Sequence, residues 1–278
     1  NPRGGLRASI QRRHCAMIDE APVLEGRGLT KRYSALTAVR DVNFAISPRQ
    51  VLGVLGPNGS GKSTIVKMVT GLLEPSQGTI LFQGRPIGDD LSGYKRALGY
   101  VPEQPELYGY LTGWEYLEMV ATLRGLDRRL FREKAAVMLE GFTLYPSRDM
   151  AISSYSKGMR QRIVVIAALL HNPEILILDE PFSGLDVTSA LVLRRVVELL
   201  AERGKAVLFS SPVMEQVDRL CTHLVMLKRG SVVAAGSIGE IHESLVGLDL
   251  EAGLMQLTEH VDAGHNAESI AAAATTVG

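Results

Sequence analysis

Apolar and polar positions alternate along three segments near the start of the chain, as they do in half-buried antiparallel strands. These segments are residues 23–29, 38–46 and 79–82. Residues 51–55 form a continuous apolar run instead, which is typical of a strand buried on both faces. The first third of the chain therefore predicts an antiparallel β part beside the first strand of a buried sheet.

The rest of the chain alternates short apolar runs with helical periodicity. Further buried strands are predicted at 175–178 and 206–210, and a hairpin at 224–227 and 231–235. Helices are predicted at 63–72, 116–123, 130–139, 159–170, 189–203 and 214–220. Buried strands that alternate with helices indicate a mostly parallel sheet with right-handed crossovers. The expected fold class is α/β, with an antiparallel β subdomain and an α-helical subdomain.

Composition narrows the classes of function. The 278 residues carry 30 Lys and Arg against 30 Asp and Glu, so the net charge is zero. No basic surface is indicated, and nucleic acid is not an expected partner. The longest apolar stretch, 163–170, is far shorter than the roughly 20 residues of a membrane helix. If the chain serves transport, another polypeptide must supply the channel.

Domain limits follow from where the regular patterns begin and end. We expect a disordered N-terminal extension at 1–21, one domain at 22–240 with a helical subdomain at 105–158, and a tail at 241–278. Residues 1–16 are expected to lie upstream of the natural start at Met17, or to be foreign to the protein. Cys15 and Cys221 stand in unlike contexts, so no disulfide is expected, which suits a reducing cytoplasm.

A phosphate-binding motif follows the strand at 51–55. It fits G-x-x-x-x-G-K-[ST], with a strand before it and a helix after it. Glycines allow backbone N–H groups to wrap a phosphate, the lysine reaches the β- and γ-phosphates, and the serine hydroxyl ligates Mg²⁺. A glycine-rich turn with a chance lysine is the plain alternative, and both flanks argue against it. The expected ATP-binding residues are Gly56, Pro57, Asn58, Gly59, Ser60, Gly61, Lys62, Ser63 and Thr64, with Ser63 also on the metal.

A second motif of the same kind ends the apolar run at 175–178. Asp179 follows that strand, at the sheet edge where ligands of α/β proteins bind, and is expected to hold Mg²⁺, through water. Glu180 comes next and is the expected catalytic general base for the attacking water. A simpler interpretation is that Asp179 and Glu180 are two solvated acids at the end of a buried strand. The phosphate loop in the same chain favours the functional interpretation instead.

Residues 155–162, Tyr-Ser-Lys-Gly-Met-Arg-Gln-Arg, resemble the signature of ABC-type ATPases, L-S-G-G-Q-x-Q-R. The resemblance extends over roughly residues 23–245 and implies a P-loop NTPase core. It also implies that Ser156 and Gly158 contact the nucleotide of a second subunit, where a helix N-terminus forms an anion site. Locally, Ser156 is also a suitable helix N-cap.

The same resemblance assigns further site residues. Tyr33 matches the aromatic residue that stacks on adenine, although a tyrosine near a strand is often plain packing. Asp186 belongs to segment 183–186, which matches the dimer interface, and is counted with the nucleotide-binding residues. Residues 99–102 look like the start of a loop that links the core to the helical subdomain, presents a metal ligand and touches a permease. The spacing leaves Glu103 and Gln104 as alternative ligands.

One departure from the family pattern affects catalysis. Where the family has a histidine that contacts the γ-phosphate, this chain has Pro212. Proline has neither a side-chain donor nor a backbone N–H. Losing one such contact typically costs about 10²–10³ in rate. ATP binding should survive, whereas hydrolysis is expected to be slow, to depend on a partner, or to rely on Glu180 alone.

The resemblance supports two competing functions. In the first, the chain is an ATPase subunit that dimerises around two ATP–Mg²⁺ and powers export by a separate membrane permease, at the cytoplasmic face of the membrane. The Lys–Met form of the signature, which exporter ATPases often carry, favours export. In the second, it is a regulatory subunit that binds ATP and hydrolyses it poorly, because of Pro212. Soluble ABC proteins of DNA repair or translation fit less well, since the chain has one cassette and no heptad repeat.

Overall fold

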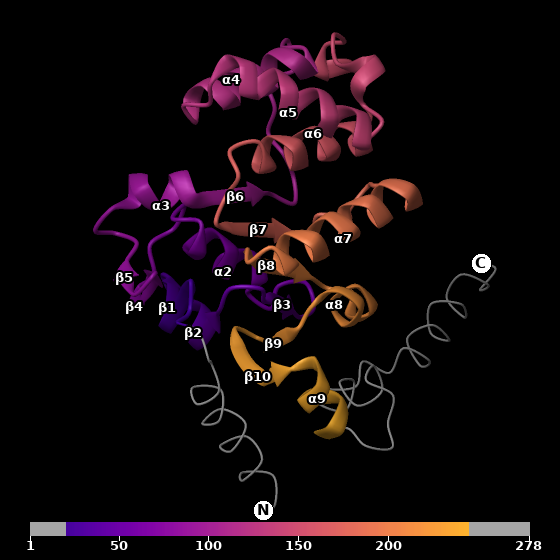
Figure 1. Ribbon diagram of the computed structural model, residues 1–278. Helices are drawn as coiled ribbons and strands as arrows, with labels where there is room; N and C mark the ends of the chain where they lie inside the picture. Colours follow the sequence, from indigo (N-terminus) through magenta and orange to yellow (C-terminus); the bar gives the residue numbers. More distant parts are fainter. Residues whose placement is uncertain (1–20, 245–278) are drawn as a thin grey trace, which may run out of the picture. The chain divides into compact units, whose positions relative to one another are not determined.

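The computed structural model describes residues 21–244, which are coloured in Figure 1. By its internal contacts the chain divides into a unit that ends at Ile238 and a second that begins at Gly239. The predicted extension at 1–21 lies outside the described residues except for its last position. The tail expected at 241–278 lies outside them beyond residue 244.

An antiparallel sheet is built in the order β2-β1-β4-β5. Its strands are β1 (Leu24–Tyr33), β2 (Leu36–Ile46), β4 (Gln77–Phe82) and β5 (Arg85–Pro86). The three strands predicted here from alternation are confirmed, and each extends beyond the predicted range at one end. Buried and exposed positions interchange along β1 and β2, because one face of the sheet packs on the core. The short strand β5 has no apolar pattern and was not predicted.

A six-stranded sheet follows the order β10-β9-β3-β8-β7-β6. It consists of β3 (Val51–Leu55), β6 (Leu98–Val101), β7 (Ile175–Asp179), β8 (Ala206–Ser211), β9 (His223–Lys228) and β10 (Ser231–Ser237). Five of these strands pair in parallel, and β10 pairs antiparallel with β9, as the predicted hairpin requires. Strands β3, β7 and β8 carry only buried residues. The prediction of a mostly parallel buried sheet is confirmed.

Strand β6 corrects the prediction that residues 99–102 open a loop. Gly99 pairs with Leu176 of β7, and the strand continues to Val101. A Cβ at Gly99 would stand 2.6 Å from the carbonyl oxygen of Ala168. Close packing of a helix end therefore requires glycine at this strand position, and glycine conceals the strand pattern in the sequence. The connection to the helical part begins only after Val101.

Helices α2 (Lys62–Val69), α3 (Leu91–Ala97), α7 (Val187–Glu202) and α8 (Met214–Leu220) belong to the sheet-containing part, and α9 (Ile238–Ser244) ends the described residues. Helix α2 begins one residue earlier than predicted and ends at Val69 rather than 72. Gly71 stops it, with a left-handed φ of 68°. Helix α3 was not predicted. Its N-cap is Asp90, whose carboxylate accepts a hydrogen bond from Gly93 N.

A helical group lies beside the six-stranded sheet, at its β6 edge (Figure 1). It contains α4 (Gly113–Leu123), α5 (Arg128–Gly141) and α6 (Lys157–Leu169), with short 3₁₀ turns at Tyr145–Ser147 and Ile152–Ser154. Helix α6 buries nearly every residue from Ile163 onward, since it packs on α4, α5 and strand β6. The predicted α-helical subdomain is present.

The main core lies between the two sheets and α2. It is made of aliphatic side chains from β1, β2, β3, β7 and β8 with those of α2. Cys221 is buried with a free thiol, while Cys15 lies outside the described residues. Within residues 21–244, no helix is both long and apolar enough to cross a membrane.

Candidate functional site

The phosphate loop connects the end of β3 to the start of α2. Gly56 is buried, and a Cβ there would stand 2.5 Å from both Leu227 O and Ser60 Oγ. Gly61 has φ 108°, and a Cβ there would stand 2.8 Å from Ala38 O. These close contacts explain why glycine stands at both ends of the loop. The intervening residues 57–59 are exposed, so the loop opens its middle to solvent.

Lys62 is the first residue of α2 and is only 4% exposed. Its Nζ donates a hydrogen bond to Gly56 O at 2.9 Å and lies 3.8 Å from Glu180 Oε1. Burial lowers the pKa of the Lys62 ammonium, and the carboxylates of Glu180, Asp179 and Glu103 oppose that shift. The Lys62 ammonium is therefore a buried cation that contacts the carbonyl of Gly56 and lies among the carboxylates of this site.

Asp179 ends β7 at the carboxyl edge of the parallel strands and is 5% exposed. Its Oδ1 has no hydrogen-bond partner within residues 21–244. Burial raises the pKa of the Asp179 carboxyl, and the charges of Glu103 and Glu180 raise it further. The hydroxyl of Ser210 and the charge of Lys62 act in the opposite direction without cancelling the rise. A buried carboxylate oxygen without a donor is suited to a cation or to water held by one.

The donor set fits Mg²⁺ that arrives with a nucleotide. Ser63 is half-buried in the first turn of α2, and Asp179 supplies the orphaned oxygen. Within residues 21–244, no cluster of three or more His, Cys, Asp or Glu side chains could hold a metal by itself. Mg²⁺ commonly takes one or two protein oxygens and completes its shell with water and phosphate, so these residues match its needs.

Glu180 follows β7 directly in a left-handed backbone conformation, with φ 47°. That conformation costs a residue with a Cβ about 1–2 kcal/mol. It is held by a hydrogen bond from Glu180 N to Ser210 O at 3.0 Å. The carboxylate is 23% exposed, so it can meet water beside the buried ammonium of Lys62.

Glu103 lies two residues beyond β6 and is half-buried. Its charge acts on the pKa values of Lys62, Asp179 and Tyr100, which places the carboxylate among these groups. Burial raises the pKa of Tyr100 to about 12, with smaller contributions from Asp179 and Glu103. Gln104 is exposed. Glu103 is therefore the charged one of the two alternative ligands, and its charge acts on Lys62 and Asp179.

Tyr33 is the last residue of β1 and is 45% exposed. It pairs with Leu36, two residues before Ala38, whose carbonyl oxygen faces the loop glycine Gly61. The end of the β1–β2 hairpin therefore lies beside the phosphate loop. An exposed ring at this point can stack on a base, although Lys31 Nζ also lies 5.6 Å from its centroid.

The signature residues form a second cluster. Ser156 caps α6, where its Oγ accepts a hydrogen bond from Met159 N at 3.2 Å. Asp186 caps α7 and accepts hydrogen bonds from Ser189 N and Oγ, which lower the pKa of its carboxyl. A Cβ at Gly158 would stand 2.7 Å from Gly184 O, so the two segments touch. Within residues 21–244, no hydrogen bond or ion pair joins this cluster to the phosphate loop.

Pro212 follows β8 directly and is exposed. The turn around it is held by Ser211, whose Oγ accepts from Val213 N at 3.0 Å and donates to Gln216 Oε1 at 2.8 Å. Ser211 in turn pairs with Leu55, the last residue before the phosphate loop. Pro212 therefore lies one residue beyond the pairing of β8 with the strand that leads into the phosphate loop.

Three site residues were not predicted from the sequence. Ser210 pairs with Asp179 across β7 and β8 and is fully buried. Gln161 is 2% exposed and donates to Pro181 O at 3.2 Å, next to Glu180. Gly230 N donates to Ser60 O at 2.9 Å and so supports the phosphate loop from the β9–β10 turn. For Gln161, its place within the motif at 155–162 was the available signal.

Known proteins resemble this chain over most of its described length. A family model described as ABC transporter matches residues 39–183. The ABC-type transporter ATP-binding protein EcsA of Bacillus subtilis (strain 168) is 32% identical over 245 residues, covering 87% of this chain and 99% of that protein. Two further relatives are the uncharacterized ABC transporter ATP-binding proteins all4389 of Nostoc sp. (strain PCC 7120 / SAG 25.82 / UTEX 2576) and YhaQ of Bacillus subtilis (strain 168). The matched region spans 62% and 72% of their own lengths.

Solved structures agree with the fold. The structure of an ATP-binding subunit of an ABC transporter superposes with a TM-score of 0.81 at 32% identity, covering 85% of this chain and 100% of that one. A dimeric bacterial ABC transporter cassette superposes with a TM-score of 0.72 at 25% identity, covering 77% of this chain and 98% of that one.

Proposed function

Because the chain belongs to the ABC transporter family of ATP-binding proteins, we propose that it hydrolyses ATP to drive a separate membrane permease. One observation carries this proposal. The ammonium of Lys62, the carboxylate of Asp179 and the carboxylate of Glu180 meet at the edge of the sheet where β3 and β7 end. This set combines a phosphate-binding cation, a metal ligand and a base within one site.

In this function, the phosphate loop binds the nucleotide. Backbone N–H groups of Asn58, Gly59 and Gly61 and the N-terminus of α2 surround the phosphates. Lys62 is already desolvated, so its charge attracts phosphate more strongly than a solvated lysine would. Tyr33 stacks on the adenine at the open end of the β1–β2 hairpin.

For Mg²⁺, the proposed ligands are the Ser63 hydroxyl, with Asp179 acting through water. When bound, Mg²⁺ would neutralise the negative charge that develops on the β- and γ-phosphates. Glu103 is proposed as the further ligand rather than Gln104, because its charge acts on both Lys62 and Asp179.

Glu180 is the proposed general base. Its carboxylate is partly exposed and accepts the proton of the attacking water; without nucleotide it lies 3.8 Å from the Lys62 ammonium. The left-handed backbone at Glu180 is a strain that the fold maintains beside Asp179, as is often found at functional sites.

A dimer completes the site. Ser156 and Gly158 are proposed to contact the γ-phosphate of a nucleotide held by a second subunit, with the N-terminus of α6 directed at it. Asp186 is proposed to lie at the same interface. The separation of this cluster from the phosphate loop within one chain, and the dimeric cassette that the chain resembles, support this arrangement. The second subunit is either another copy of this chain or a different ABC ATPase subunit.

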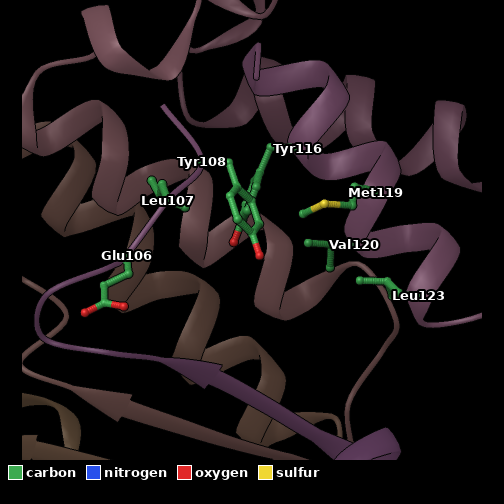
Figure 2. Close-up of a pocket in the computed structure, with 7 residues that line it drawn as sticks. All are labelled: Glu106, Leu107, Tyr108, Tyr116, Met119, Val120 and Leu123. Carbon is green, nitrogen blue, oxygen red and sulfur yellow. The ribbon is translucent and has the colours of Figure 1, made fainter. Parts of the chain in front are cut away.

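The permease is proposed to dock on a groove of the helical part, shown in Figure 2. One wall comes from the segment after β6 and the other from one face of α4, where positions 116, 119, 120 and 123 share a side. The lining residues are Glu106, Leu107, Tyr108, Tyr116, Met119, Val120 and Leu123. Leu123 is 79% exposed and Tyr108 is 53% exposed, and apolar surface of this kind favours a protein partner.

Export is the proposed direction, with the chain on the cytoplasmic face of the membrane through its permease. The Lys–Met form of the signature at 155–162 is the support for export.

Steady-state ATP turnover tests the proposal. The purified chain is compared with Glu180→Gln, each alone and with its permease. Turnover in the wild type that exceeds the variant by at least about tenfold is expected, because the base is retained only there. Equal turnover in both, even with permease, would remove the proposed hydrolysis.

A second candidate function is regulatory: the chain binds ATP and hydrolyses it poorly. Pro212 is the observation that favours it, since the turn after β8 offers no side-chain donor to a γ-phosphate. Equal turnover in the comparison above, together with retained ATP binding, would favour this candidate.

A further inference from the structure

The side chain of Lys157 crosses from the first turn of α6 to the segment 181–184 that follows Glu180. Its Nζ donates a hydrogen bond to Ser183 Oγ at 3.0 Å. Its aliphatic part covers Gly184, where a Cβ would stand 2.9 Å from Lys157 Cδ. Gly184 has φ 77°, so both the backbone and the packing at this position favour glycine.

Two more contacts join the same face of α6 to the same segment. Gln161 Nε2 donates to Pro181 O at 3.2 Å from a side chain that is 2% exposed. Gly158 approaches Gly184 O so closely that a Cβ would stand 2.7 Å from it. Positions 157 and 161, and 158 and 161, are neighbours on a helix surface. The start of α6 and the residues after Glu180 therefore form one connected piece.

We propose that Lys157 is a positioning residue that couples the two nucleotide sites of the dimer. This inference rests on the proposed function. In that dimer, the start of α6 faces the nucleotide of the second subunit, while Glu180 acts on the nucleotide of its own. Lys157 then links the start of α6, which contacts one nucleotide, to segment 181–184, which follows the base that acts on the other nucleotide.

Lys157 differs from Gln161 in its surroundings, and this difference makes it the coupling residue. Gln161 is buried, so its hydrogen bond is the same in the monomer and in a dimer. Lys157 is exposed, and its bond to Ser183 competes with water in the monomer. When a second subunit covers the surface, water is excluded and the charged hydrogen bond strengthens. The link is therefore made tight by dimer formation itself.

The test uses the full chain with Lys157→Met, which keeps much of the aliphatic stem and removes the ammonium. Two quantities are measured: the Hill coefficient for ATP in turnover, and ATP-driven dimerisation in a Glu180→Gln background by sedimentation. Lys157→Met is expected to bring the Hill coefficient toward 1 and to raise the ATP concentration for half-dimerisation by about 2- to 10-fold, the effect of one hydrogen bond. Its affinity for ATP as a monomer should stay unchanged.

Four variants serve as controls. Ser183→Ala should reproduce the effect of Lys157→Met, and the double variant should add nothing further, because both remove one bond. Lys157→Arg should restore the Hill coefficient. Lys95→Met removes an exposed lysine from α3 and should behave as wild type.

The outcomes separate the inference from the function on which it rests. Wild-type cooperativity and dimerisation in both Lys157→Met and Ser183→Ala would overturn the coupling role while leaving the dimer intact. Absence of ATP-driven dimerisation in the Glu180→Gln parent would instead overturn the proposed dimer, and the coupling role with it.

Discussion

The ammonium of Lys62 lies 3.8 Å from the carboxylate of Glu180, although the two residues stand on different elements. Lys62 begins α2, and Glu180 follows β7. The same ammonium donates to Gly56 O at 2.9 Å within the phosphate loop. A phosphate bound in the loop would therefore compete with Glu180 for this cation. Nucleotide binding and the freedom of the base are linked through one buried charge.

Replacing Pro212 by histidine is expected to raise ATP turnover. The turn is held by Ser211 and not by the proline, so a donor placed at 212 should project beside the site. One donor to a transition state is worth about 10²–10³ in rate, and recovering part of it predicts at least about a tenfold gain. The measurement is kcat for ATP hydrolysis at saturating Mg²⁺–ATP.

Pro212→Ala is the matched control, because it restores the backbone N–H without adding a side-chain donor. It should leave kcat near that of the wild type. An equal gain in both variants would show that the proline ring, rather than the missing donor, limits turnover.

Replacing Gly230 by alanine is expected to weaken ATP binding as well as stability. Gly230 N supports the phosphate loop through Ser60 O, and a Cβ would stand 2.5 Å from Ala38 O. Gly204→Ala is the control, since Gly204 also has positive φ, 93°, but nothing lies within 4 Å of the added carbon. Gly204→Ala should lose about 1 kcal/mol of unfolding free energy in urea through backbone strain, and Gly230→Ala should lose more because the added carbon also clashes with Ala38 O. Only Gly230→Ala should also raise the Kd for ATP.

Replacing Asp179 by asparagine is expected to stabilise the protein without nucleotide. Burial raises the pKa of this carboxyl, so the folded protein pays to keep it charged at neutral pH. Removing the charge should therefore raise Tm at pH 7. In thermal melts with Mg²⁺–ATP, the wild type should instead have the higher Tm, because only the wild type keeps the full metal site.

The pH dependence of the Tm difference between Asp179→Asn and the wild type identifies its cause. When a folded-state pKa is raised, the folded protein binds a proton before the unfolded chain as pH falls. The destabilisation by Asp179 is therefore full above its raised pKa and disappears as pH falls toward the ordinary value of about 3.9. The Tm difference between Asp179→Asn and wild type should shrink over that window. A constant difference would mean that packing, and not charge, separates the two.

Much of the fold could be predicted because its strands are buried on both faces. Apolar runs such as Val51–Leu55 and Ile175–Asp179 stand out in the sequence. Strand β6 was missed because Gly99 is required by the neighbouring helix end, which interrupts the apolar run. Strand β5 and helix α3 are short and polar, so their positions depend on pairing and capping rather than on periodicity.

The site was predictable where one local motif defines it and was not where distant segments meet. The phosphate loop carries its own pattern. The support of Ser60 by Gly230 and the bond from Lys157 to Ser183 join segments far apart in the chain, and only the folded structure brings them together. The roles of Glu103, Tyr33 and Asp186 stay predictions, since their local geometry permits these roles and also serves simpler packing or capping.

ATP binding by Lys62→Ala, measured calorimetrically with Mg²⁺ present, tests the phosphate-loop assignment most directly. Loss of the buried ammonium leaves the phosphate charge uncompensated, so the Kd for ATP is expected to rise at least about 100-fold, as for a charged hydrogen bond worth about 3 kcal/mol. Lys67→Ala, which removes an exposed lysine from the same helix, should bind as wild type. Wild-type affinity in Lys62→Ala would contradict the assignment of the nucleotide site.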